Sequence, residues 1–169
     1  RDQQKKGTNV LFVDESIFPQ NLAVIQTRVI PQGMKIQVGN YKELEFTPEI
    51  FACIIQYPNA SGSVEDYREF VEKAHAANCK VAVDADILSL ALLLPPGEWG
   101  ADIVFGSTQR LGIPLFYGGP SAAYFATRDE YKRNMPGRII GLSKDKYGKI
   151  CYRMALQTRE QHIKREKAT

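Results

Sequence analysis

Short apolar runs alternate along this chain with windows in which apolar residues recur every three or four positions. Four of the runs are nearly continuous, as is typical of strands buried on both faces of a parallel sheet; they lie at 9–13, 52–56, 80–83 and 102–105. Further strands are expected at 34–38 and 122–126. Strands that alternate with helices predict an α/β fold of three layers with a mostly parallel sheet.

Helical periodicity fills the intervals between these strands. Residues 18–29 form one predicted helix, with Pro19 at the position that suits a first turn. Residues 64–77 form the clearest one, because their apolar positions lie on one face and Ser63 precedes them as a cap. A third, short helix is expected from Thr47 to about residue 51, with Pro48 in its first turn.

The pattern changes after Ala126. A helix is expected at 127–135, a hairpin at 145–152, and a charged helix with few apolar positions at 158–168. We therefore divide the chain into a large-domain core at 1–126 and an extension at 127–169 that leads towards the next part of a longer parent protein. The absence of an initiator methionine suggests the same fragment interpretation.

Charge and cysteine content narrow the classes of function. The chain of 169 residues has 22 basic and 19 acidic side chains, a balance too even to indicate a nucleic-acid or membrane partner. No apolar stretch reaches the roughly 18 residues of a membrane span. The three scattered cysteines favour buried thiols in a reducing compartment, and two histidines offer no zinc spacing, so no metal site is predicted.

Two strand ends carry the chemistry expected of a cofactor site. The strand at 80–83 delivers the Asp84 carboxylate, and the strand at 102–105 runs into residues 106–110. In an aminotransferase-like domain such an Asp pairs with the pyridinium nitrogen of pyridoxal phosphate, and a lysine after the second strand forms the Schiff base. Here Gln109 and Arg110 stand where that lysine is expected, and neither side chain can replace it. No catalytic residue is therefore assigned.

Each of these residues also has a purely structural interpretation. Asp84 is either a relic of the pyridinium partner or a carboxylate that bonds loop amides. The glycines of 106–110 and 117–120 either let backbone amides approach an anion or serve tight turns. Arg110 either binds a phosphate or clamps the loop that carries it.

Three long runs resemble the P protein of the glycine cleavage system, and they lie at 95–110, 117–141 and 154–169. A looser likeness extends back to Val10. The resemblance implies a fold-type-I pyridoxal-phosphate architecture and a part in a glycine decarboxylase, an oxidoreductase that passes an aminomethyl group to the lipoyl arm of the H protein. It also implies that this is the N-terminal half, and that the cofactor lysine belongs to the C-terminal half, as the position of Gln109 suggests.

The resemblance implies the cofactor and partners as well. Pyridoxal phosphate is expected in the complete enzyme and none on this piece alone, and the partners are the other half of the P protein and the H protein. The expected location is the cytoplasm in a bacterium and the mitochondrial matrix in a eukaryote. A homo-oligomer is expected of the isolated fragment, because a sheet with an open edge and an uncovered face favours self-association.

Two other functions compete with an inactive piece of the enzyme. The first is a non-catalytic scaffold or partner-binding domain derived from the same fold. The second is a nucleotide-binding domain, which is weak because no strand is followed by a glycine-rich phosphate loop.

Overall fold

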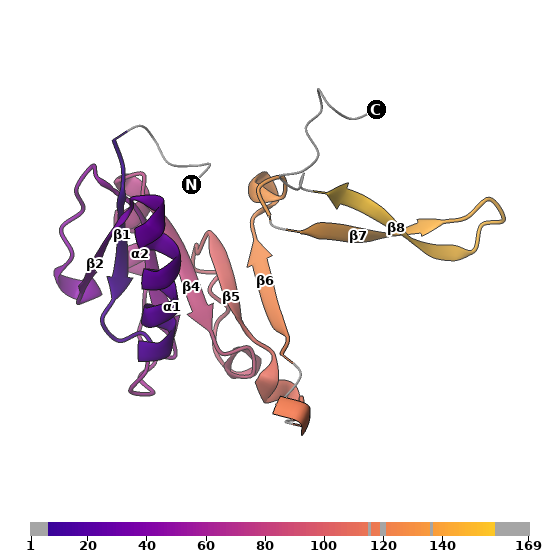
Figure 1. The fold of residues 1–169 in the computed structure, drawn as a ribbon, viewed down its shortest axis with the longest axis horizontal. Coiled ribbons are helices and arrows are strands. Elements are labelled where there is room, and N and C mark those ends of the chain that lie inside the picture. The colour runs from indigo at the N-terminus through magenta and orange to yellow at the C-terminus, as the bar shows by residue number, and fades with distance from the viewer. Residues whose placement is uncertain (1–6, 115, 119–120, 136, 158–169) are drawn as a thin grey trace. The chain divides into compact units, whose positions relative to one another are not determined.

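The computed structural model describes residues 7–114, 116–118, 121–135 and 137–157. Contacts between Cα atoms divide the chain into two compact units, Arg1–Thr127 and Arg128–Thr169. The first unit contains a sheet of six strands and two α-helices, and the second contains a two-stranded sheet (Figure 1).

The large sheet has the order β2-β1-β3-β4-β5-β6. All neighbouring pairs are parallel except β5 with β6, which is antiparallel. This confirms the mostly parallel α/β sheet expected from the sequence. The strands are β1 (Val10–Asp14), β2 (Lys35–Gly39), β3 (Ile50–Tyr57), β4 (Lys80–Ala85), β5 (Ile103–Ser107) and β6 (Ala123–Thr127).

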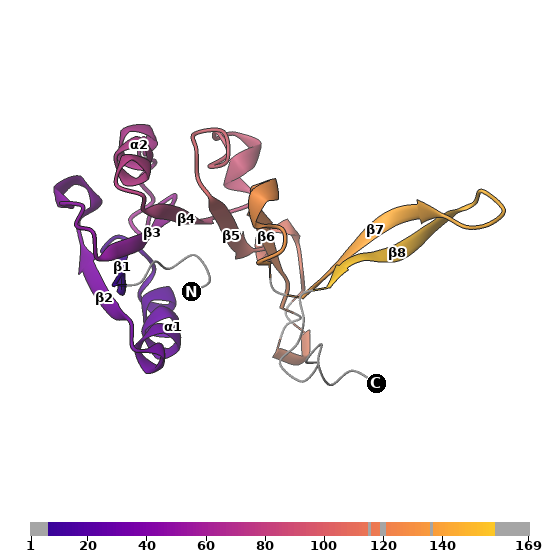
Figure 2. The same ribbon diagram turned by 90° about the horizontal axis from the view of Figure 1, so that it is seen from above.

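The two helices lie on opposite faces of the sheet, α1 (Pro19–Val29) on one side and α2 (Arg68–Ala76) on the other (Figure 2). Each face has its own apolar cluster. The smaller cluster joins Leu11, Val13 and Ile17 to the inner side of α1. The larger one contains Phe70, Val71 and other side chains of α2 together with one face of β3, β4 and β5. These three layers position the carboxyl ends of β1, β3, β4 and β5 at one edge.

Burial explains why the predicted strands form. Val81 and Val83 of β4 are 0% exposed, and burying one such side chain stabilises the fold by about 1.5–3 kcal/mol. Cys53 and Cys79 are free thiols in this core, with their Sγ atoms 3.4 Å apart. Their mutual hydrogen bond and burial raise the pKa of Cys53 far above its usual range, so the pair is inert core.

Three helix predictions differ from the structure. No helix forms at 47–51, because β3 already begins at Ile50, whose partner is Val10 of β1. The helix expected from residue 64 begins at Arg68, and Ser63 does not cap it; the Ser63 amide donates to Asn59 in the preceding turn instead. The helix expected at 127–135 is a single 3₁₀ turn, Asp129–Tyr131. The predicted helix at 158–168 lies outside the described residues.

The second unit is an antiparallel ribbon of β7 (Arg138–Lys144) and β8 (Ile150–Gln157). The predicted hairpin is therefore confirmed and is longer than expected. Asp145 organises its turn, where its side chain accepts hydrogen bonds from the amides of Tyr147 and Lys149 at 2.8 and 2.9 Å. Gly148 there has a φ of 81°, a conformation that glycine adopts without strain.

Candidate functional site

Asp84 stands at the carboxyl end of β4 and is 8% exposed. Asn21, in the first turns of α1, donates a hydrogen bond from its Nδ2 to the Asp84 carboxylate. Burial raises the pKa of Asp84 to about 6, and the Asn21 hydrogen bond opposes that rise only in part. The sequence did not single out Asn21, since nothing local marks a helix asparagine as the partner of a residue 63 positions away.

Gln109 lies just beyond the carboxyl end of β5, in the 3₁₀ turn Gln109–Leu111. Its side-chain amide donates to the carbonyl of Ile113, and its backbone amide donates to the Ser107 hydroxyl at 3.0 Å. The side chain therefore closes its own loop. The sequence from residue 107 to 114 contains no lysine.

Gly106 lies near the carboxyl end of β5, and close packing explains why this position is a glycine. A Cβ atom built there would lie 2.2 Å from the carbonyl oxygen of Ala85 and 2.9 Å from the ring of Tyr124. The Tyr124 hydroxyl donates to the same Ala85 oxygen at 2.7 Å. Gly106 thus permits a close approach of β5 to β4 and β6. This observation favours the structural interpretation of Gly106 over an anion channel.

Arg110 contacts Asp86 in the loop after β4, with its Nη1 atom 3.4 Å from the carboxylate. Asp86 also accepts a hydrogen bond from the amide of Leu88 at 3.0 Å. Arg110 therefore joins the loops that follow β4 and β5, as expected of a clamp. The other glycine-rich stretch, 117–120, is described only at Tyr117 and Gly118.

Gln56 lies beside Asp84 at the end of β3, where it is 2% exposed. Its Nε2 donates to the backbone carbonyl of Asp84 at 3.1 Å, whereas its Oε1 is buried and has no hydrogen-bond partner among the residues that the structure describes. A buried amide acceptor without a donor is uncommon in folded proteins. Sequence reasoning treated Gln56 only as a strand residue, because the apolar run that contains it hides its chemistry.

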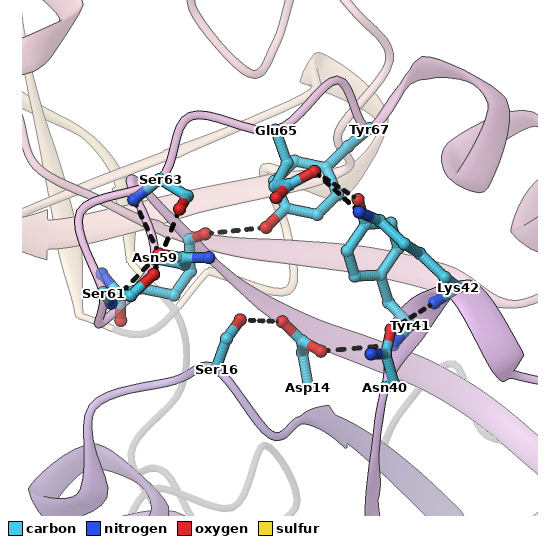
Figure 3. Close-up of polar contacts among 11 residues, drawn as sticks. Asp14, Ser16, Asn40, Tyr41, Lys42, Asn59, Ser61, Ser63, Glu65 and Tyr67 are labelled. Carbon is cyan, nitrogen blue, oxygen red and sulfur yellow. Dashed lines mark hydrogen bonds and ion pairs between the residues drawn. The ribbon is translucent and has the colours of Figure 1, made fainter.

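A polar network ties together the loops after β1, β2 and β3 (Figure 3). The Asp14 carboxylate accepts from the Ser16 hydroxyl and from the amide of Tyr41. The Tyr41 hydroxyl donates to Glu65 at 3.1 Å, and the Tyr67 hydroxyl donates to the carbonyl of Gln56 at 3.2 Å. Each of these polar groups bonds to another part of the protein, so the network stabilises the edge of the sheet.

The opposite edge of the sheet lies near His75, in the last turn of α2. The Nε2 atom of His75 lies 2.8 Å from the carboxylate of Asp102, which also accepts from the Val81 amide at 2.9 Å. Burial would raise the pKa of Asp102, but the Val81 amide, His75 and Lys80 together hold it below its usual value. The group connects α2, β4 and β5, and a structural role accounts for it.

The described residues contain neither a membrane-spanning helix nor a cluster of metal-binding side chains. Within ranges 7–114, 116–118, 121–135 and 137–157, no helix has the length and apolar character that a membrane crossing requires. In that same part of the chain, no group of three or more His, Cys, Asp or Glu residues could hold a metal ion.

Comparison with solved structures identifies the fold. A cystathionine gamma-lyase from Lactobacillus plantarum matches with a TM-score of 0.61 and 17% identity, over 75% of this chain and 34% of that one. An O-acetylhomoserine (thiol)-lyase from Campylobacter jejuni, solved with N′-pyridoxyl-lysine-5′-monophosphate, matches with a TM-score of 0.58 and 13% identity. This match covers 72% of this chain and 31% of that one. The first unit thus has the α/β fold of the fold-type-I pyridoxal-phosphate enzymes.

The family follows from a closer set of matches. The family described as glycine cleavage system P-protein matches residues 1–169, and the chain belongs to it. A glycine decarboxylase (P-protein) of the glycine cleavage system, solved in inhibitor-bound form, matches with a TM-score of 0.84 and 35% identity, over 96% of this chain and 38% of that one.

Curated relatives agree with this family. Glycine dehydrogenase (decarboxylating) of Bacteroides thetaiotaomicron is 80% identical over all 169 residues, which make up 18% of that protein. The mitochondrial glycine dehydrogenase (decarboxylating) of Dictyostelium discoideum is 54% identical over 98% of this chain and 17% of its own length. The chain thus spans about a sixth of the length of these relatives.

The residues at the sheet edge fit pyridoxal phosphate only in part. Asp84 was expected as a pyridinium partner, but burial raises its pKa to about 6, and its carboxylate already accepts a hydrogen bond from Asn21. At the end of β5, the Gln109 amide cannot form a covalent link to the aldehyde, and it is already bonded to Ile113. This edge therefore does not fit a covalently held cofactor, and we derive no reaction step through one.

Proposed function

We propose that this chain is a catalytically silent piece of a glycine decarboxylase, an oxidoreductase of the glycine cleavage system. The observation that carries this proposal is Gln109, which stands at the end of β5 where a lysine anchor is expected. Membership of the P-protein family supports the parent activity. The piece would supply structural support and contact surface, whereas the cofactor lysine would belong to the C-terminal half of the parent.

The parent protein would act on glycine with bound pyridoxal phosphate, which supplies an electron sink for loss of CO2. Its aminomethyl product would pass to the lipoyl arm of the H protein. The partners proposed for this chain are accordingly the other half of the P protein and the H protein. The location would be cytoplasmic in a bacterium and the mitochondrial matrix in a eukaryote, as the Dictyostelium relative's name supports.

The test is reductive trapping on the isolated chain. Pyridoxal phosphate is added, borohydride reduces any imine, and peptide mapping locates the pyridoxyl groups. We expect only scattered, substoichiometric labelling of surface lysines, because the loop after β5 offers a glutamine. Stoichiometric labelling of one lysine would overturn the proposal.

A scaffold or partner-binding domain is the second candidate. It is favoured by the same edge of the sheet, where the side chains of Asp84, Gln109 and Arg110 all bond to other groups of the protein. The two candidates separate when the chain is joined to the rest of a P protein. Recovery of glycine decarboxylation there supports the enzyme piece, and no recovery supports the scaffold.

A further inference from the structure

Gln56 and Asp84 are neighbours on one face of the sheet. They are register partners in the parallel pair of β3 and β4. Ile55 and Val83, the residues before them, both belong to the apolar cluster on the α2 side, so the alternation of a strand turns Gln56 and Asp84 towards α1. From that side, Asn21 of α1 donates to the Oδ2 atom of Asp84. Three elements therefore meet at these polar side chains.

The hydrogen bonds of this group leave two acceptors over. Gln56 donates from Nε2 to the Asp84 carbonyl at 3.1 Å. Because that carbonyl can only accept, the amide is fixed with its Oε1 atom turned away, and Oε1 is buried with no donor among the described residues. In the same part of the chain, the Asp84 Oδ1 atom accepts no hydrogen bond either. Two adjacent side chains thus each present an acceptor that lacks a donor.

A proton on Asp84 would supply the missing donor. A protonated carboxyl donates through one oxygen and still accepts through the other. With its proton on Oδ1, Asp84 can donate to the Oε1 atom of Gln56 while its Oδ2 atom accepts from Asn21. Burial, which raises the pKa of Asp84 to about 6, favours the same protonated form.

The titratable groups around Asp84 belong to α1, β3, β6 and the loops after β4 and β5; they are Arg28, Tyr57, Tyr124, Asp86 and Arg110. Arg28 lies in the last turn of α1, and Asp86 is paired with Arg110 at 3.4 Å. Burial raises the pKa of Tyr57, and it raises the pKa of Tyr124 to about 12. Asp84 is therefore the member of this group that titrates below neutral pH while it is buried.

We propose that Asn21, Asp84 and Gln56 form a proton latch at the carboxyl edge of the sheet. At low pH the Asp84 carboxylate takes up a proton from solvent on Oδ1 and donates it in a hydrogen bond to Gln56 Oε1, which completes a chain from α1 through β4 to β3. When the proton is lost, the buried carboxylate attracts water, and the first turns of α1 loosen from the edge. The latch needs no cofactor and goes beyond the function proposed for the chain.

NMR titration of the chain tests the hydrogen bond itself. The Cγ resonance of Asp84 and the Cδ resonance of Gln56 should change with one common midpoint, because the same proton affects both groups. In Asp84→Asn, whose side-chain amide can donate at every pH, the Gln56 resonance should not titrate. A Gln56 resonance that is independent of pH in the wild type would overturn the proposal, and that measurement needs no variant.

Gln56→Met separates the latch from burial alone. Loss of the acceptor oxygen should lower the pKa of Asp84 by about one pH unit. An effect of burial alone would raise it instead, because methionine is the more apolar side chain. Ile54→Met, on the same face of β3, is the matched control and should leave the pKa of Asp84 unchanged. An unchanged or raised pKa in Gln56→Met would contradict the latch.

Hydrogen exchange measures the consequence for α1. After correction for the intrinsic exchange rate, protection of the α1 amides in the wild type should be about tenfold lower at about pH 7.5 than at about pH 4.5. In Asp84→Asn the protection should be equal at the two pH values. Equal protection in the wild type would show that the proton does not control the helix, and would overturn the proposal.

Discussion

At the residue scale, Gln109 is held by the protein itself, since its side-chain amide donates to the Ile113 carbonyl. We predict that Gln109→Lys does not create a stoichiometric, saturable imine with pyridoxal phosphate. The change would remove the side-chain amide that closes this loop, and the Asp84 carboxyl would still be bonded to Asn21. Visible absorbance followed by borohydride trapping measures this. A single labelled site at residue 109 would show that only the anchor had been lost.

Asp84 makes a second prediction at this scale, concerning pH. Its folded-state pKa of about 6 lies above its ordinary value of 3.8, so the folded state holds the proton more tightly. The contribution of Asp84 to stability is therefore fully present below about pH 3.8 and is lost as pH rises through about 6, a loss of up to about 3 kcal/mol. Asp84→Asn should remove this fall.

Urea unfolding of the wild type and of Asp84→Asn, at about pH 4.5 and about pH 7.5, measures the difference in their free energies of unfolding. The variant should gain more stability relative to the wild type at the higher pH than at the lower one. Glu98→Gln, which changes an exposed carboxyl in the same unit, should show no such difference. A difference between Asp84→Asn and the wild type that is equal at both pH values would contradict the assignment.

At the scale of elements, the packing of β5 between β4 and β6 depends on Gly106. A Cβ atom 2.2 Å from the Ala85 oxygen cannot be accommodated without movement of the backbone, so Gly106→Ala should destabilise the first unit by about 2–4 kcal/mol. Gly97→Ala is the control, because nothing lies within 4 Å of a Cβ atom there. Thermal unfolding measures both, and similar melting temperatures for the two variants would argue against the close approach.

Strand positions could be predicted from the sequence because buried strands are marked by their own apolar runs. The helix predicted at 18–29 is also observed, at Pro19–Val29, but the boundaries of the later helices could not be predicted. Thr47 and Pro48 look like a helix start, yet Ile50 pairs with β1, so the sheet overrides the local preference. Tyr67 matches the helical spacing, but it precedes the first turn, and its hydroxyl bonds to Gln56. Such long-range contacts leave no local signal.

In the candidate site, too, some residues could be singled out from the sequence and others could not. Asp84 and Gln109 were found because each follows a strand that the pattern predicts. Asn21 and Tyr124 were missed, because their contacts with Asp84 and Ala85 span 63 and 39 positions. Only the folded sheet brings these residues to one edge.

At the scale of the whole molecule, the charge is divided between the two units, with the basic excess on the ribbon and the acidic excess on residues 7–127. The relatives are nearly six times as long as this chain, which makes up 17–18% of them. Both facts are consistent with a piece whose surfaces are meant for contact. The proposed role is therefore one of support, with the covalent chemistry located elsewhere in the parent.

The measurement that tests this central claim most directly is borohydride trapping in a full-length P protein that carries this segment. Pyridoxal phosphate is bound, the imine is reduced, and mass spectrometry of the digest locates the pyridoxyl group. The account predicts one stoichiometric label, on a lysine outside residues 1–169, and the same result when Gln109 is changed to Ala. A stoichiometric label on any lysine within residues 1–169 would contradict it.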